Sequence, residues 1–195
     1  YEGDIKNNTK DDFIGNSNRL KLAQHIREFI HTNKTTHLKS KIKSEEFIKY
    51  IELARLNGDV IEKFINNTSI LDERKIEILE TLTKKDFCDI KYEVLCDMEL
   101  AYKYKKNTSL DIFNKYLLPL RVENETLYPQ RAFIKQYFKA NTKIEDILSL
   151  INELALLDKY SYPALVADVK GIIENKIATS YSVPIHLVQI SRALG

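Results

Sequence analysis

Residues that interrupt helices or cross-link a chain are scarce in this sequence of 195 residues. It contains five glycines, four prolines, two cysteines and no tryptophan. Lysine, isoleucine, leucine, glutamate and asparagine are abundant instead. Because few residues break a helix and many favour one, the composition predicts an all-α fold. Cys88 and Cys96, if they lie on one helix, would be about 12 Å apart, which is too far for a disulfide.

Features that would point to several other classes of protein are also missing. The sequence has no run of 18 apolar residues, so we expect no transmembrane helix. Thirty basic and 28 acidic residues give a formal net charge of +2, which argues against a nucleic-acid-binding protein. Cysteines and histidines do not have the spacing of a zinc site, and no glycine-rich loop suits a phosphate. We therefore expect neither a metal nor a cofactor.

Helix signals recur along the chain from Asn16 onward. An apolar stripe at helical spacing, which includes Leu20, Ile26 and Phe29, predicts a first amphipathic helix. Thr142 with Glu145 forms a capping-box pattern at the start of the clearest predicted helix, 142–160. We expect nine or ten helices, packed in antiparallel or oblique pairs. The other predicted helices cover 44–57, 59–67, 72–82, 89–105, 109–118, 129–139, 162–177 and 182–194.

The predicted organisation has three segments. Residues 1–15 are polar and unpatterned and are expected to form an irregular lead-in. Residues 16–141 are expected to form a helical N-terminal domain, and residues 142–195 a further group of helices.

The stretch DIFNKYLLPLRVENE, residues 111–125, combines an apolar helix with a charged loop. Pro119 ends the helix because proline has no N–H and restricts the residue before it. Arg121 then comes close to Glu123 and Glu125, and a guanidinium can pair with a carboxylate through two hydrogen bonds. Two roles stay open for Arg121: it fixes this loop, or it contacts a ligand.

This stretch resembles the helical region that precedes the catalytic core of bacterial transglutaminase-like (cysteine protease-like) proteins, especially secreted Bacteroidetes-type ones. The resemblance covers about 45 residues, from Glu93 to Tyr137. The family pattern D-I-F-x-x-Y-V-L-P-x-R-x-N-N-E is matched, in order, by Asp111, Ile112, Phe113, Tyr116, Leu118, Pro119, Arg121, Asn124 and Glu125, and Gln130-Arg131 and Tyr137-Phe138 follow. The resemblance marks Arg121, Glu125 and Arg131 as residues that contact a ligand or fix the loop.

The last 18 residues, ATSYSVPIHLVQISRALG, are similar to the nucleophile helix of the same family. Its ending, Arg-Ala-(Leu/Val/Ile)-Gly, is matched by residues 192–195, which places the family's catalytic cysteine at Ser180. A helix N-terminus lowers the pKa of a thiol and can stabilise an oxyanion. Ser180 has a hydroxyl instead. Pro184 lacks the N–H that a helix starting at 180 would need, so we expect the helix to begin near Ser182.

Two functions follow as expectations. The resemblance implies a transglutaminase-like protein, truncated and catalytically incomplete as given, whose family chemistry is thiol acyl transfer or amide hydrolysis. Whether the protein is an enzyme stays open, because the chain has neither the cysteine nor the downstream histidine and aspartate. The alternative is a non-enzymatic helical module that binds a protein or peptide. An extracytoplasmic location, in the periplasm or at the cell surface, is expected with a lipid anchor upstream of Tyr1 left open; the alternative is the cytoplasm.

Overall fold

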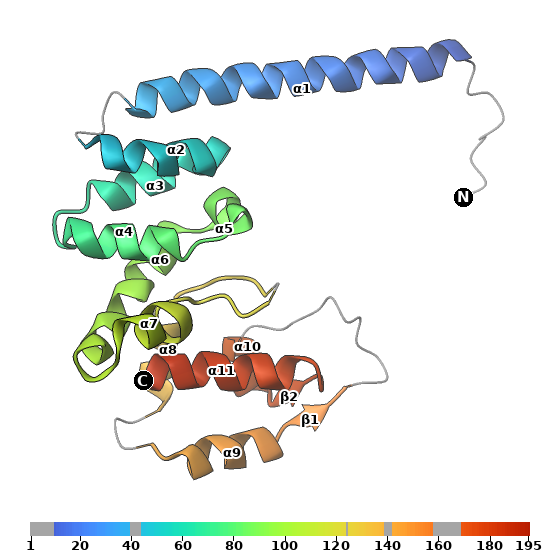
Figure 1. The fold of residues 1–195 in the computed structure, drawn as a ribbon. Helices are drawn as coiled ribbons and strands as arrows, with labels where there is room; N and C mark the ends of the chain where they lie inside the picture. Colours follow the sequence, from blue (N-terminus) through green and yellow to red (C-terminus); the bar gives the residue numbers. More distant parts are fainter. Residues whose placement is uncertain (1–9, 40–43, 124, 139–141, 158–168) are drawn as a thin grey trace.

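The computed structural model describes residues 10–39, 44–123, 125–138, 142–157 and 169–195. Helices make up nearly all of these ranges, which confirms the predicted all-α class (Figure 1). The α-helices are α1 (Lys10–Lys39), α2 (Ile48–Ala54), α3 (Gly58–Ile65), α4 (Asp72–Glu80), α5 (Lys84–Asp89), α6 (Tyr92–Glu99), α7 (Leu110–Ile112), α8 (Gln130–Tyr137), α9 (Ile144–Asn152), α10 (Val169–Asn175) and α11 (Ser182–Leu194). Three 3₁₀ segments, η2 (Glu45–Phe47), η3 (Arg55–Asn57) and η4 (Leu100–Asn107), and the π-helical η5 (Phe113–Leu117) extend them.

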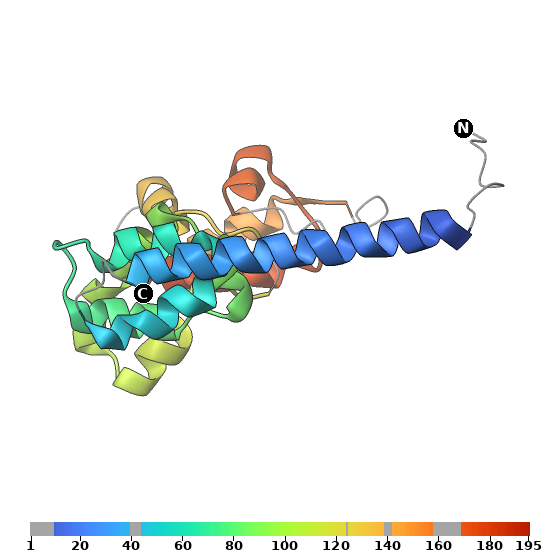
Figure 2. The same cartoon turned by 90° about the horizontal axis from the view of Figure 1, so that it is seen from above.

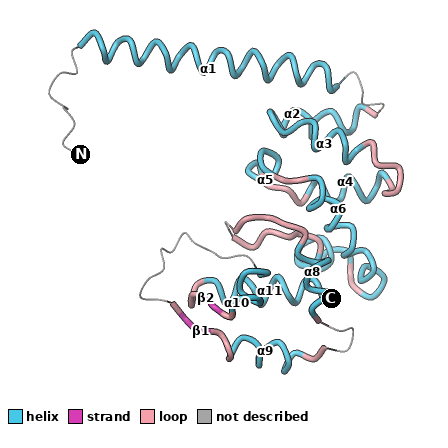
Figure 3. Tube along the Cα trace, turned by 180° about the vertical axis from the view of Figure 1, so that it is seen from behind, coloured by secondary structure: helices cyan, strands magenta, loops and turns pink. Residues whose placement is uncertain are grey.

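The helices are layered broadly in chain order, with α1 at one end of the molecule and α9 at the other (Figures 1 and 3). Helix α1 runs across the end of this stack and projects well beyond it (Figure 2). Only its last turns reach the core, where Leu38 is buried. Gly58 allows this contact, because a Cβ on Gly58 would lie 2.6 Å from Leu38 Cδ1. No helix in the described ranges has both the length and the apolar character needed to cross a membrane.

Helix α1 differs from its prediction in two ways. It begins at Lys10, so residues 10–15 are helical and not irregular; two acidic residues in its first turn, Asp11 and Asp12, suit a helix start. Residues 1–9 lie outside the described ranges. The predicted apolar stripe is exposed, since Leu20 and Phe29 are 72% and 66% accessible. A helical period alone shows which side chains share a face, and not whether anything covers that face.

The helix predicted over 142–160 is much shorter than expected. Helix α9 ends at Asn152, and its first turn is capped at Lys143, whose N–H donates to the Asp146 carboxylate at 2.8 Å. The capping pair therefore lies one residue later than the predicted Thr142 and Glu145. Beyond α9, the strand β1 (Ala155–Leu156) pairs in parallel with β2 (Ile177–Ala178). This pairing with a distant segment takes the apolar end of the predicted helix out of it.

Two other predicted helices also change. The helix expected over 89–105 is divided, because Ile90 adopts an extended conformation between α5 and α6. Cys88 and Cys96 therefore lie on different helices, and both are free thiols. The helix expected over 162–177 is described only from Val169, and its predicted first turn at Pro163 lies outside the described residues. Helix α11 begins at Ser182, as Pro184 predicted.

The buried apolar side chains form two clusters. The first extends from Leu38 to Leu127 and is built on α2 to η5. The second joins Ile134 of α8, Ile147 of α9, α10 and Ile190 of α11. Helix α8 packs chiefly against α11 and also touches α6, so it connects the two clusters. The predicted boundary between 141 and 142 falls inside the second cluster.

Candidate functional site

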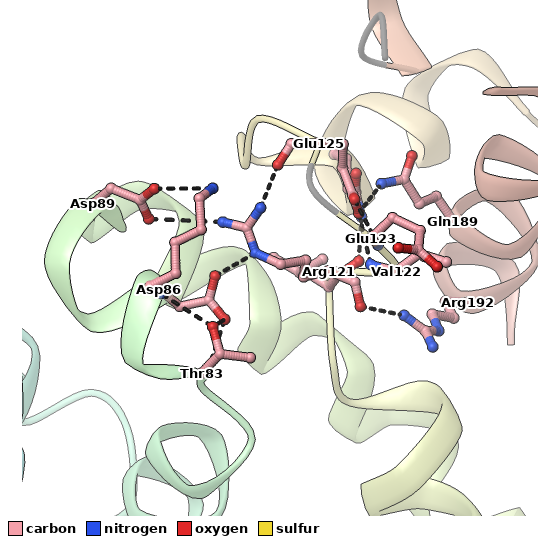
Figure 4. A network of polar contacts seen from close by, with 12 residues as sticks. Thr83, Asp86, Asp89, Arg121, Val122, Glu123, Glu125, Gln189 and Arg192 are labelled. Atoms are coloured by element: carbon pink, nitrogen blue, oxygen red, sulfur yellow. Dashed lines mark hydrogen bonds and ion pairs between the residues drawn. The ribbon is translucent and has the colours of Figure 1, made fainter. Parts of the chain in front are cut away.

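Arg121 lies in the loop between η5 and α8 and points toward α5 (Figure 4). Its Nε donates to Asp86 Oδ1 at 2.5 Å, and its Nη2 is 3.7 Å from Asp89 Oδ1. Asp86 is held in place because it also closes a capping box with Thr83 at the start of α5. The carboxylates that pair with Arg121 thus come from α5, whereas the sequence suggested the acidic residues of its own loop. Its contact with Glu125 is to the backbone oxygen.

Glu125 connects this loop to α11. Its buried carboxylate accepts the backbone N–H groups of Val122 and Glu123 at 2.7 and 2.8 Å. It also accepts a hydrogen bond from Gln189 Nε2 at 2.8 Å. The other end of the Gln189 amide contacts His186 Nδ1 at 3.0 Å. These bonds hold the loop in one conformation and fasten it to α11.

The cavity beside Arg121 is too small for most ligands. It measures about 160 Å³, whereas small-molecule sites usually measure ~300–1,000 Å³. The donors of Arg121 are already directed at Asp86, Asp89 and the Glu125 backbone. Of the two roles left open for Arg121, these contacts support loop fixing.

Two further arginines converge on the carbonyl of Pro119. Arg131, on α8, is completely buried, and its Nη2 donates to the backbone oxygens of Leu118 and Pro119 at 3.0 and 3.5 Å, and to that of Leu117. Arg192, on α11, donates from Nη1 to the oxygens of Pro119 and Arg121 at 3.3 and 3.1 Å. Both guanidiniums thus bind carbonyls at the end of η5.

The charges of these two arginines are poorly compensated. Nε and Nη1 of Arg131 and Nε of Arg192 are buried without a hydrogen-bond partner. Burial lowers the pKa of Arg131 to about 10, against the attraction of Asp97, and the positive charge of Arg192 lowers it further. Burial also lowers the pKa of Arg192, with Glu125 opposing it. Buried charged groups with displaced pKa values often mark functional sites.

Lys135, one turn after Arg131 on α8, provides a test of this electropositive region. Burial, with repulsion from Lys103 and Arg131, lowers its pKa to about 8. A lysine whose pKa falls on folding destabilises the folded state while it is charged. That cost is present below pH 8 and disappears as the pH rises toward the unfolded value, about 10.4. The stability of the wild type relative to Lys135→Gln should therefore rise between pH 8 and 10.5, as measured by urea unfolding; a pH-independent difference would contradict the lowered pKa.

Ser180 lies in the turn before α11 and is exposed. The cap of this helix is formed around it and not by it: Thr179 Oγ1 accepts the N–H of Ser182 at 3.1 Å, and Ser182 Oγ accepts the N–H of Thr179 at 2.9 Å. Ser180 shares a shallow surface pocket of about 510 Å³ with Val122, Glu123, Tyr181, Pro184, Ile185 and Val188. None of these side chains is an imidazole or amine that can take a proton from a serine hydroxyl.

An apolar cleft of about 600 Å³ lies between η5, α9 and α11, within the usual size range of ligand pockets. It opens to solvent, since Ile144 and Tyr116 on its wall are 61% and 51% exposed. Among the described residues that line it, Arg192 alone carries a charge. The lining residues are Tyr116, Leu117, Thr142, Ile144, Ile147, Leu187, Val188, Ser191, Arg192, Leu194 and Gly195.

The structure brings some of the predicted site residues together. Arg121 and Glu125 belong to one network, which reaches α11, and Arg131 binds the carbonyls just before it. Ser180 lines a different pocket from that network's partners on α5. Sequence reasoning missed Asp86, Gln189, Arg192 as a binding group, and Asp97. The pattern Thr83-x-x-Asp86 marks a helix start, but nothing local connects Asp86 to a loop 35 residues later.

In the part of the chain that the structure describes, no group of three or more histidine, cysteine, aspartate or glutamate residues is placed to hold a metal ion. Comparisons of the chain with protein-family models, curated proteins and solved structures found no match.

Proposed function

We propose that the protein is a non-enzymatic helical module that binds an apolar segment of a partner protein in the cleft between α9 and α11. The observation that carries this proposal is the cleft itself, which is apolar, open to solvent and large enough for several aliphatic side chains. Grooves between helices are a recurrent way of binding apolar peptide segments. The contacts of Arg121 and Glu125 support a structural role for both, so the proposal assigns them no chemistry.

A neutral peptide probe, dansyl-leucyl-leucine amide, tests this proposal by fluorescence titration. Val188 lines the cleft and is partly exposed, so we expect Val188→Asp to fold. It should bind the probe at least about tenfold more weakly than the wild type, because the new carboxylate is costly to desolvate. The control is Leu71→Asp, since Leu71 is an exposed leucine of the first cluster region that should leave binding unchanged. Absence of probe binding by the wild type, or equal binding by Val188→Asp, would refute the proposal.

We also propose a second candidate, a catalytically incomplete transglutaminase-like protein. One observation favours it: the two stretches that carry the resemblance are bonded together, through Glu125 with Gln189 and through the Arg121 carbonyl with Arg192. If Ser180 occupies the place of a catalytic thiol, the thiol of Ser180→Cys should have a pKa below about 7, compared with ~8.5 for an ordinary cysteine. Alkylation rates measured against pH, with Tyr181→Cys as the exposed control, give this value. An ordinary pKa at position 180 counts against the candidate.

A further inference from the structure

The charge beside the apolar cleft indicates what kind of segment the cleft accepts. Arg192 lines the cleft, and Arg131 binds the backbone oxygen of Leu117, which lines it too. In the described part of the chain, neither guanidinium forms an ion pair with a carboxylate. Three of their nitrogens are buried without a hydrogen-bond partner. An apolar cleft with an uncompensated guanidinium on its wall attracts an apolar ligand that carries an anionic group.

The nearest carboxylates do not supply this missing charge, because other groups already occupy them. The oxygens of Asp97 accept the backbone N–H groups of Arg131 and Ala132, each at 2.8 Å. Glu125 accepts two backbone N–H groups of its own loop and the Gln189 amide. Both carboxylates are therefore directed away from the two guanidiniums and into the fixed loops and helix starts.

The two guanidiniums also lie close to each other, because they share the Pro119 carbonyl at 3.5 and 3.3 Å. Two positive groups on one acceptor repel each other. A carboxylate bound to Arg192 would offset this repulsion and would be held by a planar donor that matches its geometry.

We propose that the segment bound in the cleft ends in a free C-terminal carboxylate, which pairs with Arg192 while the last apolar side chains of the segment fill the cleft. This inference rests on the proposed binding function. A chain terminus suits the site because its carboxylate lies within one residue of an apolar side chain. The exposed wall at Tyr116 and Ile144 leaves room for the rest of the partner to continue into solvent, which favours a peptide over an enclosed acyl chain.

A matched pair of probes tests the inference: dansyl-leucyl-leucine with a free carboxylate, and its amide. The wild type should bind the carboxylate about tenfold more tightly than the amide at low salt. This preference should shrink at ~0.5 M salt, because ions screen the charge. Arg192→Gln should bind both probes equally, and Arg192→Lys should keep part of the preference. Lys143→Gln is the control, since Lys143 is an exposed cation adjacent in sequence to two cleft residues, and it should keep the whole preference.

Each outcome decides between the two proposals. If the wild type binds both probes equally, the inference about the carboxylate is wrong and the binding function stands. If it binds neither probe, both are wrong. If decanoate binds more tightly than the peptide carboxylate, the ligand is an acyl chain and not a peptide terminus. If circular dichroism shows that Arg192→Gln does not fold, Arg192→Lys and the salt series on the wild type decide: a preference that is independent of salt overturns the inference.

Discussion

Arg121→Met is expected to lower the free energy of unfolding by about 3–5 kcal/mol, as is typical when one partner of a buried ion pair is removed. Arg121 and Asp86 have side chains that are only 10% and 3% exposed. Methionine leaves the Asp86 carboxylate buried without its cation, and it also removes the donor to the Glu125 backbone. Urea unfolding followed by far-UV circular dichroism measures the change.

Two comparisons make this prediction specific. The double variant Asp86→Asn/Arg121→Met should be more stable than Arg121→Met alone, because it has no uncompensated buried charge. Lys85→Met removes an exposed ion pair with Asp89 on the same helix, 3.3 Å apart, and should cost no more than about 0.5 kcal/mol. A loss of less than about 1 kcal/mol in Arg121→Met would show that the pair is not the contact that holds the loop.

The parts of the fold that could be predicted are those whose signals lie within a few residues of each other. Pro184 placed the start of α11 at Ser182, since the missing N–H acts four residues back. Asp72 and Pro129 likewise mark the starts of α4 and α8. The end of α9 could not be predicted in this way, because Ala155 donates to Lys176 O at 2.9 Å, and a partner 21 residues away has no local signal.

The same distinction applies to the candidate site. The charge pattern around Arg121 and Glu125 marked the loop as a place of ion pairing. It did not identify the partners, because Asp86 precedes Arg121 by 35 residues and Gln189 follows Glu125 by 64. The cleft was also hidden, since its walls come from η5, α9 and α11, and each wall taken alone resembles an ordinary amphipathic helix. Only the packing of these helices shows that their apolar faces leave a space.

Asp97→Ala is expected to lower the free energy of unfolding by about 2–4 kcal/mol. The buried Asp97 carboxylate on α6 accepts two backbone N–H groups at the start of α8, those of Arg131 and Ala132. Alanine removes both acceptors, and an unsatisfied buried donor costs roughly 1–3 kcal/mol. Burial raises the pKa of Asp97, so the charged carboxylate carries a desolvation cost that alanine relieves, which places the expected loss below the sum for two donors.

The position of Asp97 makes the shape of the unfolding curve as informative as its midpoint. Val94, Leu95 and Met98 of the same helix belong to the first apolar cluster, whereas Ile134 of α8 belongs to the second. Asp97 therefore joins the two clusters by hydrogen bonds, and its loss should weaken the second cluster more than the first. Hydrogen exchange should show amides of α8 and α11 opening at lower free energy in Asp97→Ala while those of α3 keep their protection. Asp111→Ala, at an exposed position in the first turn of α7, is the control and should leave both clusters unchanged. Equal loss of protection in α3 and α11 would show that the two clusters unfold as one unit and that Asp97 does not join separable parts.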